Sequence, residues 1–452
     1  MQLIREMGAN FWRTSHYPHA PVMMDASDHL GLLVWEELPV NKEIGNTDEY
    51  ITNVMQMAKE MIDRDRNHPS IMLWGLAGEV NAAHDVAKRV VANTVAAYRE
   101  LDPTRPTAMH EPRGEDIEGL VDVAGLGAGK VTDEKHSRFP QRRYMTAEYS
   151  AALIGRGMYG GGPLSEEEGC EKHEAYLRDI NRRPWMAGGC IWNAIDYDGE
   201  TYDPVIPHMV SFGVADKWRI PKEAYYFYQS QWSEKPMVHI AGHWTWNGQE
   251  GRTRAVEVYS NAPQVELFLD GRSLGAKKDT PDDLRHPPRI WEVSYEPGTL
   301  RAVARFGTEE LADERKTAGA VYQLILKSDA KQLVSGDRES LAYLTATIAD
   351  KGGTPAPDAN QAITFTSYGP GELLPQESLQ FGIGYTVNAI GGMARMAFRS
   401  TSRSGEAVVS AYVPGLRLGR TSILVTAPGK PNEMDYVENK LSEHWDKHIL
   451  ER

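Results

Sequence analysis

Two glutamates, an arginine, a histidine and a tryptophan in the first half of the chain could together do chemistry on a sugar. Each stands at or just after the end of a strand-like run. They are Arg13 and His16 after the run at Asn10, Glu79 after the run at Ile71, Glu148 ending the run at Tyr144, and Trp192, with Asp196 beyond it, on the run at Met186. Two carboxylates facing one polar pocket can cleave a glycosidic bond, because one protonates the leaving oxygen and the other attacks the anomeric carbon or activates water.

The elements that must bring these residues together are the strands of one parallel sheet. Strand-like runs alternate with helical patterns over residues 1–232, as in the capping box Ser165–Glu168 and the apolar spacing from Ile51 to Ile62. We predict strands near Asn10, Leu32, Ile71, Thr107, Val121, Tyr144 and Met186. Strands alternating with helices predict a (β/α)8 TIM-type barrel, whose first strand would here lie before residue 1. Because catalytic residues of such barrels stand at the C-terminal strand ends, the polar residues would converge on one mouth.

Each of these residues also has a plainer interpretation. A glutamate at a strand end is more often solvated or salt-bridged than catalytic. Arg13 could simply pair with an acid, His16 in SHYPH could belong to a turn, and Trp192 could be part of the core. Their joint occurrence at strand ends is what favours chemistry.

Composition limits the classes of partner. The chain of 452 residues has a formal net charge of −14, which argues against nucleic acid, since phosphate binding needs a basic face. No run approaches the roughly 18 apolar residues of a membrane span. Cys170 and Cys190 stand in no CxxC or Cys/His cluster, so we expect no metal site, and a disulfide between them is the less favoured alternative. The run GLGAGK, residues 125–130, lacks two defining positions of a phosphate-binding loop and is rejected.

The pattern changes to β structure after residue 232. Period-two runs and the hairpin signal Asp270-Gly271 predict a β-sandwich over residues 236–318, and further runs predict an Ig-like sandwich over 319–428, before a polar tail at 429–452. The expected fold class is α/β plus all-β: a barrel domain, 1–232, without its first strand, followed by two Ig-like β-sandwich domains. Trp244 and Trp246 could stack on a sugar, although packing is the plainer interpretation.

The candidate residues lie in longer runs that resemble a known enzyme family. These runs are GANFWRTSHYPHAPVMMDASDHLGLLVWEE, RDRNHPSIMLWGLAGE, TAEYSA, GGCIWNAIDY and FGVADKWRIPKEAYYFYQSQW. They resemble the catalytic barrel of glycoside hydrolase family 2, which includes β-galactosidases and β-glucuronidases. The resemblance covers residues 1–232, and the later β runs resemble the sandwich domains that follow the barrel in many bacterial members. Since members carry two β domains and the first barrel strand before this region, the resemblance implies a C-terminal portion that begins inside the barrel.

The resemblance also implies roles. It implies retaining hydrolysis, with Glu79 as acid/base and Glu148 as nucleophile, and it implies that Arg13 positions the nucleophile. His16 and Trp192 match residues that line the sugar pocket. The magnesium-binding run of some β-galactosidases is absent from VWEELPVNKE, so we expect no metal and no cofactor.

Two further departures bear on substrate preference. The family usually has asparagine directly before the acid/base, where this chain has Gly78, and a tyrosine ending the sixth strand, which VDVAGLGAGK lacks. Because glycine cannot contact the sugar 2-hydroxyl, either another residue supplies the contact or the substrate is bulkier near C2. The candidates to supply it are Asn81, His16 and Asn193. We predict that plain β-galactosides are slow substrates.

The sequence therefore predicts a retaining exo-β-glycosidase, β-galactosidase-like, acting on an oligosaccharide or glycoconjugate. We expect no nucleic-acid or membrane partner, and the pattern leaves self-association into a homo-oligomer open. The alternative is a non-catalytic carbohydrate-binding protein, or an inactive fragment, on the same scaffold.

Overall fold

A computed structural model describes residues 1–83, 85–127, 133–199, 209–338, 340–374, 379–381 and 384–429. The chain divides after Lys316 into two compact units. Almost all of the expected C-terminal tail, from residue 430 onward, lies outside the described residues.

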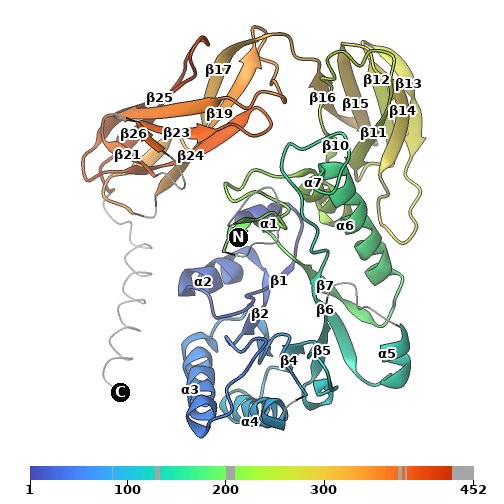
Figure 1. The fold of residues 1–452 in the computed structure, drawn as a ribbon, viewed down its shortest axis with the longest axis vertical. Coiled ribbons are helices and arrows are strands. Elements are labelled where there is room, and N and C mark those ends of the chain that lie inside the picture. Colours follow the sequence, from blue (N-terminus) through green and yellow to red (C-terminus); the bar gives the residue numbers. More distant parts are fainter. Residues whose placement is uncertain are drawn as a thin grey trace. The chain divides into compact units, whose positions relative to one another are not determined.

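The first part of unit one is a seven-stranded parallel sheet whose strands follow chain order. The strands are β1 (Phe11–Arg13), β2 (Leu33–Glu37), β3 (Ile71–Gly75), β4 (Thr107–His110), β5 (Val123–Leu126), β6 (Arg143–Tyr149) and β7 (Met186–Ile191). The helices are α1 (Gln2–Glu6), α2 (Pro21–Leu30), α3 (Asp48–Asp65), α4 (Asp85–Leu101), the 3-10 turn η1 (Glu118–Leu120), α5 (Asp133–Arg138), α6 (Glu166–Asn181) and α7 (Glu223–Trp232). Helices alternate with the strands, as Figure 1 shows. The predicted strands are all present, and the predicted barrel class is confirmed.

Local sequence signals explain how these elements begin. The Thr47 side chain accepts a hydrogen bond from the Tyr50 N–H and caps α3. The Ser165 side chain accepts one from the Glu168 N–H and caps α6, as the capping box predicts. Once capped, α3 turns one apolar face toward the sheet, because Val54, Ala58, Met61 and Ile62 are buried. These contacts fix the helix against the strands whose ends carry the candidate residues.

The interior of the barrel is small and tightly filled. Trp35, Leu73, Ala108 and Met145, from four different strands, pack together there. Strands β1 and β7 are the two edges of the sheet, and no pairing joins them in the part of the chain that the structure describes. A cavity of about 300 Å³ lies between these edges. The barrel is therefore nearly closed, with a single seam.

Two further sheets complete unit one. One contains β10 (Val238–Ile240), β11 (Thr253–Ser260) and β14 (Arg289–Ser294); the other contains β13 (Arg272–Lys278), β12 (Gln264–Leu269), β15 (Thr299–Phe306) and β16 (Glu309–Lys316). A short hairpin, β8 (Tyr197–Asp198) and β9 (Met209–Val210), lies between β7 and α7 in the chain. Asp270 and Gly271 have φ angles of 48° and 79° and join β12 to β13, which confirms the predicted hairpin.

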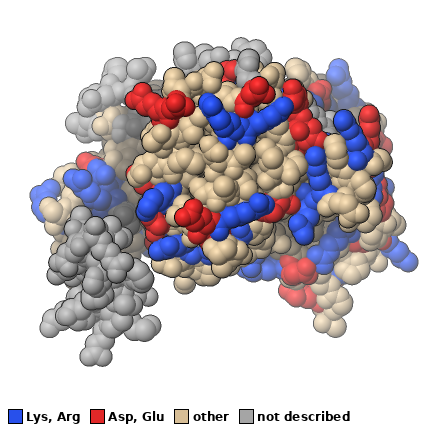
Figure 2. Space-filling model, turned by 90° about the horizontal axis from the view of Figure 1, so that it is seen from below, with Lys and Arg blue, Asp and Glu red and all other residues tan. Residues whose placement is uncertain are grey.

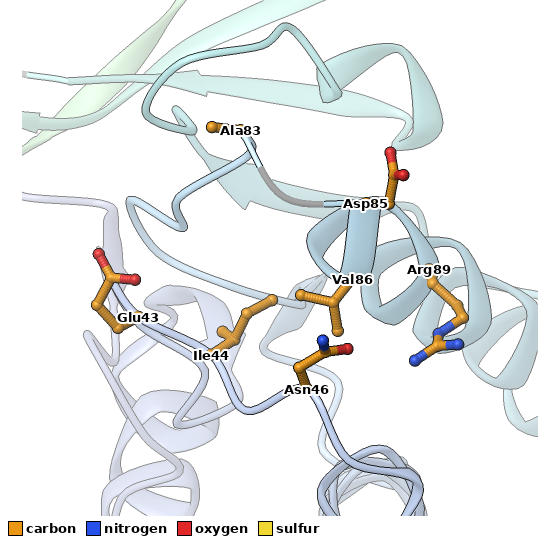
Figure 3. Close-up of a pocket in the computed structure, with 7 residues that line it drawn as sticks. All are labelled: Glu43, Ile44, Asn46, Ala83, Asp85, Val86 and Arg89. Atoms are coloured by element: carbon orange, nitrogen blue, oxygen red, sulfur yellow. The ribbon is translucent and has the colours of Figure 1, made fainter.

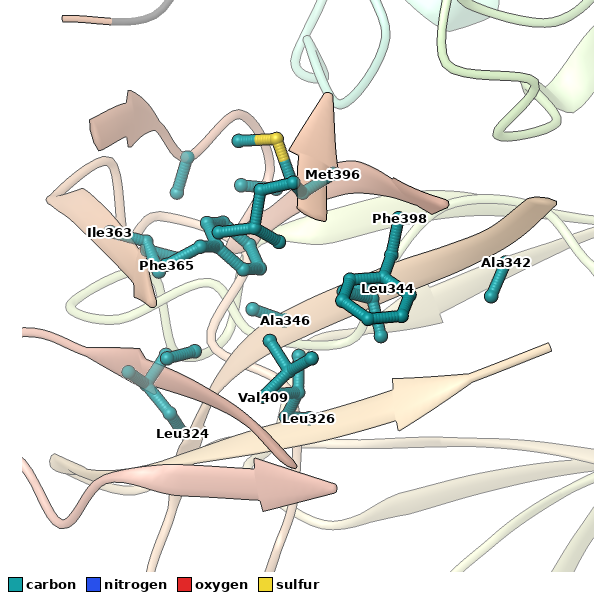
Figure 4. Close-up of a cluster of buried hydrophobic side chains, with 14 of the residues drawn as sticks. Leu324, Leu326, Ala342, Leu344, Ala346, Ile363, Phe365, Met396, Phe398 and Val409 are labelled. Atoms are coloured by element: carbon teal, nitrogen blue, oxygen red, sulfur yellow. The ribbon is translucent and has the colours of Figure 1, made fainter. Parts of the chain in front are cut away.

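Unit two is a second pair of sheets. One contains β17 (Val321–Ser328), β19 (Leu341–Asp350), β24 (Met393–Ser400) and β21 (Gly371–Leu374). The other contains β18 (Gln332–Val334), β26 (Gly419–Thr426), β25 (Gly405–Tyr412), β20 (Ala362–Tyr368), β23 (Gly384–Asn388) and β22 (Leu379–Phe381). Buried side chains from both sheets, among them Leu344, Phe365 and Phe398, form one core (Figure 4). The prediction of β-sandwiches after the barrel is confirmed.

The surface carries charges of both signs. On the face drawn in Figure 2, lysine and arginine side chains alternate with aspartate and glutamate around an uncharged centre. No helix among the described residues is long and apolar enough to cross a membrane.

Candidate active site

Arg13, the last residue of β1, is the centre of the candidate site. Its guanidinium donates two hydrogen bonds to Glu37 at the end of β2, from Nε to Oε2 at 2.8 Å and from Nη2 to Oε1 at 2.6 Å. Its third nitrogen, Nη1, donates to Glu148 Oε1 on β6 at 2.9 Å. One buried cation thus connects two carboxylates from two different strands, β2 and β6.

The charge of Arg13 governs the titration of Glu37. Burial alone would raise the pKa of Glu37, but the Arg13 charge and the hydrogen bonds from His16 and Arg13 lower it to about 2. Glu37 is therefore ionised at neutral pH and fixes the orientation of the guanidinium toward Glu148.

Glu148 is a largely buried carboxylate surrounded by nitrogen atoms. Its side chain is 15% exposed, and its Oε1 lies 3.7 Å from His16 Nε2 and 3.5 Å from His110 Nδ1. Burial raises the pKa of Glu148, Arg13 and His16 oppose that rise, and the charge of Glu79 adds to it. The two glutamates are thus close enough to interact electrostatically. A carboxylate that a buried guanidinium holds and that keeps part of its surface exposed can serve as a nucleophile.

Glu79 stands in the loop after β3 and has a strained backbone. Its φ angle is 48°, in the left-handed region that non-glycine residues rarely adopt at a cost of about 1–3 kcal/mol. The side chain is 29% exposed and accepts a hydrogen bond from Arg113 Nη2 at 2.8 Å. Glu79 is therefore the more accessible of the two acids.

Backbone hydrogen bonds to the neighbouring loop hold this strained residue in place. The N–H of Gly78 donates to Val40 O at 2.8 Å, and the N–H of Lys42 donates to Gly78 O at 3.0 Å. The N–H of Asn81 then donates to Lys42 O at 2.9 Å. The loops after β2 and β3 are therefore joined by a short ladder of backbone hydrogen bonds, and this ladder fixes the backbone that carries Glu79.

His16, Trp192 and Asn193 form one side of the site. The rings of His16 and Trp192 stack with their centroids 5.5 Å apart, and His16 Nδ1 lies 3.2 Å from Glu37 Oε1. Asn193 follows Trp192, and its Oδ1 is buried with no hydrogen-bond partner in the described part of the chain. The structure thus brings Arg13, His16, Glu148 and Trp192 into one contact network.

Asp196, the third acid expected at a strand end, does not join this network. Its Oδ1 accepts hydrogen bonds from Lys222 Nζ at 2.7 Å and from the Gly213 N–H at 2.8 Å. Burial raises its pKa to about 6, against the opposing effect of Lys222. These contacts give Asp196 a structural role.

Three residues of the site were missed by the sequence analysis. Glu37 binds Arg13, His110 ends β4 beside Glu148, and Arg113 pairs with Glu79. The rule that found Glu79 and Glu148 would have found Glu37 and His110, had it been applied to the ends of β2 and β4. Arg113 stands in a loop, and its sequence context gives no such signal.

The seam cavity reaches this site. Arg13, Trp192 and Asn193 line the cavity between β1 and β7, together with apolar side chains such as Ile4 and Phe11. A second pocket of about 610 Å³ lies between the loop after β2 and the start of α4 (Figure 3). Its lining includes Glu43, Asn46 and Arg89 but neither Glu79 nor Glu148, so it is separate from the candidate site.

The two tryptophans considered as sugar platforms pack inside unit one. Trp244 is buried, and its Nε1 donates to Glu296 O at 3.0 Å. The ring of Trp246 is covered by the Arg254 guanidinium, whose Cζ lies 3.9 Å from the ring centroid. Trp244 is therefore closed to a sugar, and one face of the Trp246 ring is covered by Arg254.

Among the described residues, no cluster of three or more His, Cys, Asp or Glu side chains could hold a metal ion. Both cysteines are free thiols, and Cys170 is buried.

Comparison with known proteins identifies the family. The family model described as "Glycosyl hydrolases family 2, TIM barrel domain" matches residues 1–234. "Domain of unknown function (DUF4982)" matches 251–312, and "Glycoside hydrolase family 2 C-terminal domain 5" matches 324–422. The chain belongs to glycoside hydrolase family 2.

Different relatives of this chain are named for different activities. The β-galactosidase BoGH2A of Bacteroides ovatus is 27% identical over 92% of this chain and 57% of its own length. A β-glucuronidase of Bacteroides fragilis is 28% identical over 61% of this chain and 44% of its own. The crystal structure of a β-glycosidase from Bacteroides vulgatus is similar with a TM-score of 0.80 and 26% identity, over 94% of this chain and 60% of that one. The chain thus spans only about half the length of the curated relatives it matches.

Proposed function

We propose that this chain carries the catalytic apparatus of a retaining exo-β-glycosidase that is β-galactosidase-like. The observation that carries the proposal is the position of Glu148, which Arg13 binds at 2.9 Å and the charge of Glu79 influences from the end of another strand. Family membership supports the same class of reaction.

In this mechanism the two acids act in turn. Glu148, oriented by Arg13, attacks the anomeric carbon while Glu79 donates a proton to the leaving oxygen. The glycosyl–Glu148 ester is then hydrolysed by a water molecule that Glu79 deprotonates, which restores both side chains and retains the anomeric configuration. The exposure of Arg113, 55% for its side chain, means that an entering substrate can displace it from Glu79.

The charges of the site support a neutral sugar. A glucuronide carries a carboxylate that needs a cation of its own in the pocket. Among the described residues of the site, Arg13 is bound to Glu37 and Glu148, and Arg113 is bound to Glu79. A neutral hexose therefore suits this arrangement better than a uronic acid.

Turnover of chromogenic aryl β-glycosides tests the proposal. We expect the chain to hydrolyse an aryl β-galactoside faster than the β-glucuronide, with retention visible by NMR of the first-formed sugar. Glu148→Gln should abolish this activity, whereas the surface variant Glu100→Gln should not. Sugar binding without turnover by the unmodified chain would instead support a carbohydrate-binding protein on the same scaffold.

A further inference from the structure

The space beside Gly78 is lined by polar atoms from three elements. A Cβ atom on Gly78 would lie 3.1 Å from His16 Nδ1 and 3.3 Å from both Arg13 Nη2 and Asn41 Oδ1. These distances are shorter than ordinary carbon contacts, so a side chain at position 78 would have to push its neighbours aside. The space is therefore already occupied, and it is not the open room for a C2 substituent that glycine suggests in the sequence.

Asn41 brings an unused hydrogen-bonding group to this space. Its backbone forms an isolated parallel bridge with Gly78, which fixes the side chain beside the acid-bearing loop. Its Oδ1 is buried and has no hydrogen-bond partner in the described structure. Buried polar atoms of folded proteins are almost always partnered, so an unpartnered acceptor next to an acid is a candidate ligand-binding group.

Other side chains near the acid are already engaged or lie elsewhere. Asn81 donates from Nδ2 to Glu43 Oε1 at 3.3 Å and accepts from the Ala83 N–H at 3.3 Å. Both nitrogens of His16 face carboxylates, Glu37 from Nδ1 and Glu148 from Nε2. Asn193 follows Trp192 after β7, and it is not among the three nearest contacts of a Cβ on Gly78.

We propose that Asn41 is a substrate-contacting residue, whose carboxamide accepts a hydrogen bond from the sugar hydroxyl next to the anomeric carbon. This inference rests on the proposed function, because Glu79 and Glu148 define where the anomeric carbon lies. The group adjacent to that carbon is the 2-hydroxyl, whose hydrogen bonds strengthen as the transition state forms. Asn41, from the loop after β2, thus supplies what glycine at position 78 cannot.

A pair of substrates that differ only at C2 tests the contact. The full chain and its Asn41→Ala variant are assayed on 4-nitrophenyl β-galactoside and on its 2-deoxy analogue. We expect Asn41→Ala to lower kcat/KM for the parent substrate about tenfold, the size of one lost hydrogen bond, and mainly through kcat. The 2-deoxy analogue should be hydrolysed equally by both proteins, because it lacks the hydroxyl.

Controls separate contact from structure. Asn46 is an exposed asparagine of the same loop and lies outside the candidate site. Asn46→Ala should leave kcat/KM unchanged for both substrates. Equal losses on both substrates in Asn41→Ala would assign Asn41 a structural role and overturn the proposal. No loss on either substrate would overturn it as well.

A binding assay distinguishes failure of this inference from failure of the proposed function. If the chain hydrolyses neither substrate, the proposed function fails, and tryptophan fluorescence then follows the binding of galactose and 2-deoxygalactose. If the unmodified chain binds galactose more tightly than 2-deoxygalactose and Asn41→Ala abolishes this difference, the contact between Asn41 and the 2-hydroxyl is supported even without catalysis. Equal affinity for the two sugars in the unmodified chain, or binding of neither, would overturn the contact.

Discussion

Arg13 Nη1 and Glu148 Oε1 are joined at 2.9 Å across 135 positions of sequence. The same guanidinium binds Glu37 through its other two nitrogens. Bidentate binding fixes the plane of the guanidinium, and the third nitrogen then donates to Glu148 and, at 3.4 Å, to the carbonyl oxygen of Ala147. The acid proposed as nucleophile is thus held by a cation that is itself held by a second acid.

The two proposed catalytic acids should respond differently to the same substitution. We expect Glu148→Gln to remove turnover of every aryl glycoside, because no other group forms the ester. Glu79→Gln should reduce turnover of substrates with poor leaving groups by about 10²–10⁴ and spare those with good ones, which need little proton donation. Rates measured over a series of aryl leaving groups check this, and equal mild losses in both variants would contradict the assignment.

A crystal structure should place the two carboxyl carbons about 5 Å apart, the spacing for retention.

The bond between Arg13 and Glu37 predicts how stability depends on pH. The pKa of Glu37 is lowered to about 2 from an ordinary value of 4.5. The contribution of Glu37 to the free energy of unfolding is therefore complete above pH 4.5 and is lost as pH falls toward 2. The shift corresponds to about 3 kcal/mol of unfolding free energy. We expect Glu37→Gln to be less stable than the unmodified chain at pH 7 and to lose less stability on acidification. Urea unfolding at pH 7 and pH 3 measures both. Parallel losses on acidification would show that Glu37 does not contribute in this way.

Adjacent residues on β2 show what the sequence could and could not reveal. Apolar runs bounded by turn signals were enough to find the seven strands and to place Glu79 and Glu148 at their ends. Successive side chains of a strand point to opposite faces, and here Glu36 pairs with Arg64 while Glu37 pairs with Arg13. Which of two neighbouring glutamates faces the barrel mouth depends on strand register, and composition does not determine it.

Asn41 shows a second limit of sequence reasoning. The sequence points to Asn81, His16 and Asn193 for the contact with the sugar 2-hydroxyl, because they are close to the acid in sequence or share its strand-end pattern. Asn41 lies beside Gly78 only because the loops after β2 and β3 run parallel. Such proximity arises from the packing of two loops, which no local pattern encodes.

The contacts of Gly78 predict a compensating pair of substitutions. Gly78→Asn introduces a Cβ at 3.1–3.3 Å from three polar atoms. His16 and Arg13 are held by carboxylates, so Asn41 is the neighbour that must move. We expect Gly78→Asn alone to lower kcat/KM on plain β-galactoside about tenfold. Gly78→Asn with Asn41→Ala should recover most of it, because the introduced asparagine then has room and can make the 2-hydroxyl contact in place of Asn41. Kinetics of the two single variants and the double variant measure the coupling. Faster turnover by Gly78→Asn alone would contradict this prediction and would indicate that glycine at position 78 leaves the 2-hydroxyl contact unmade.

The seam between β1 and β7 predicts how the 452-residue chain behaves in solution. Both strands have an unpaired edge within the described sheet, and unpaired edges are sites for pairing with another chain. The cavity between them is lined mainly by apolar side chains, including Ile4, Phe11 and Ile191, so an extended apolar segment from a second molecule can enter it. We expect the chain to self-associate with increasing concentration, as measured by light scattering coupled to size exclusion. Ile4→Lys should weaken the association by placing a charge in the cavity. Leu33→Lys, which charges an exposed apolar residue on the neighbouring strand β2, should not. Circular dichroism verifies that both variants fold, and a chain that stays monomeric at every concentration would show that the seam is closed to other molecules.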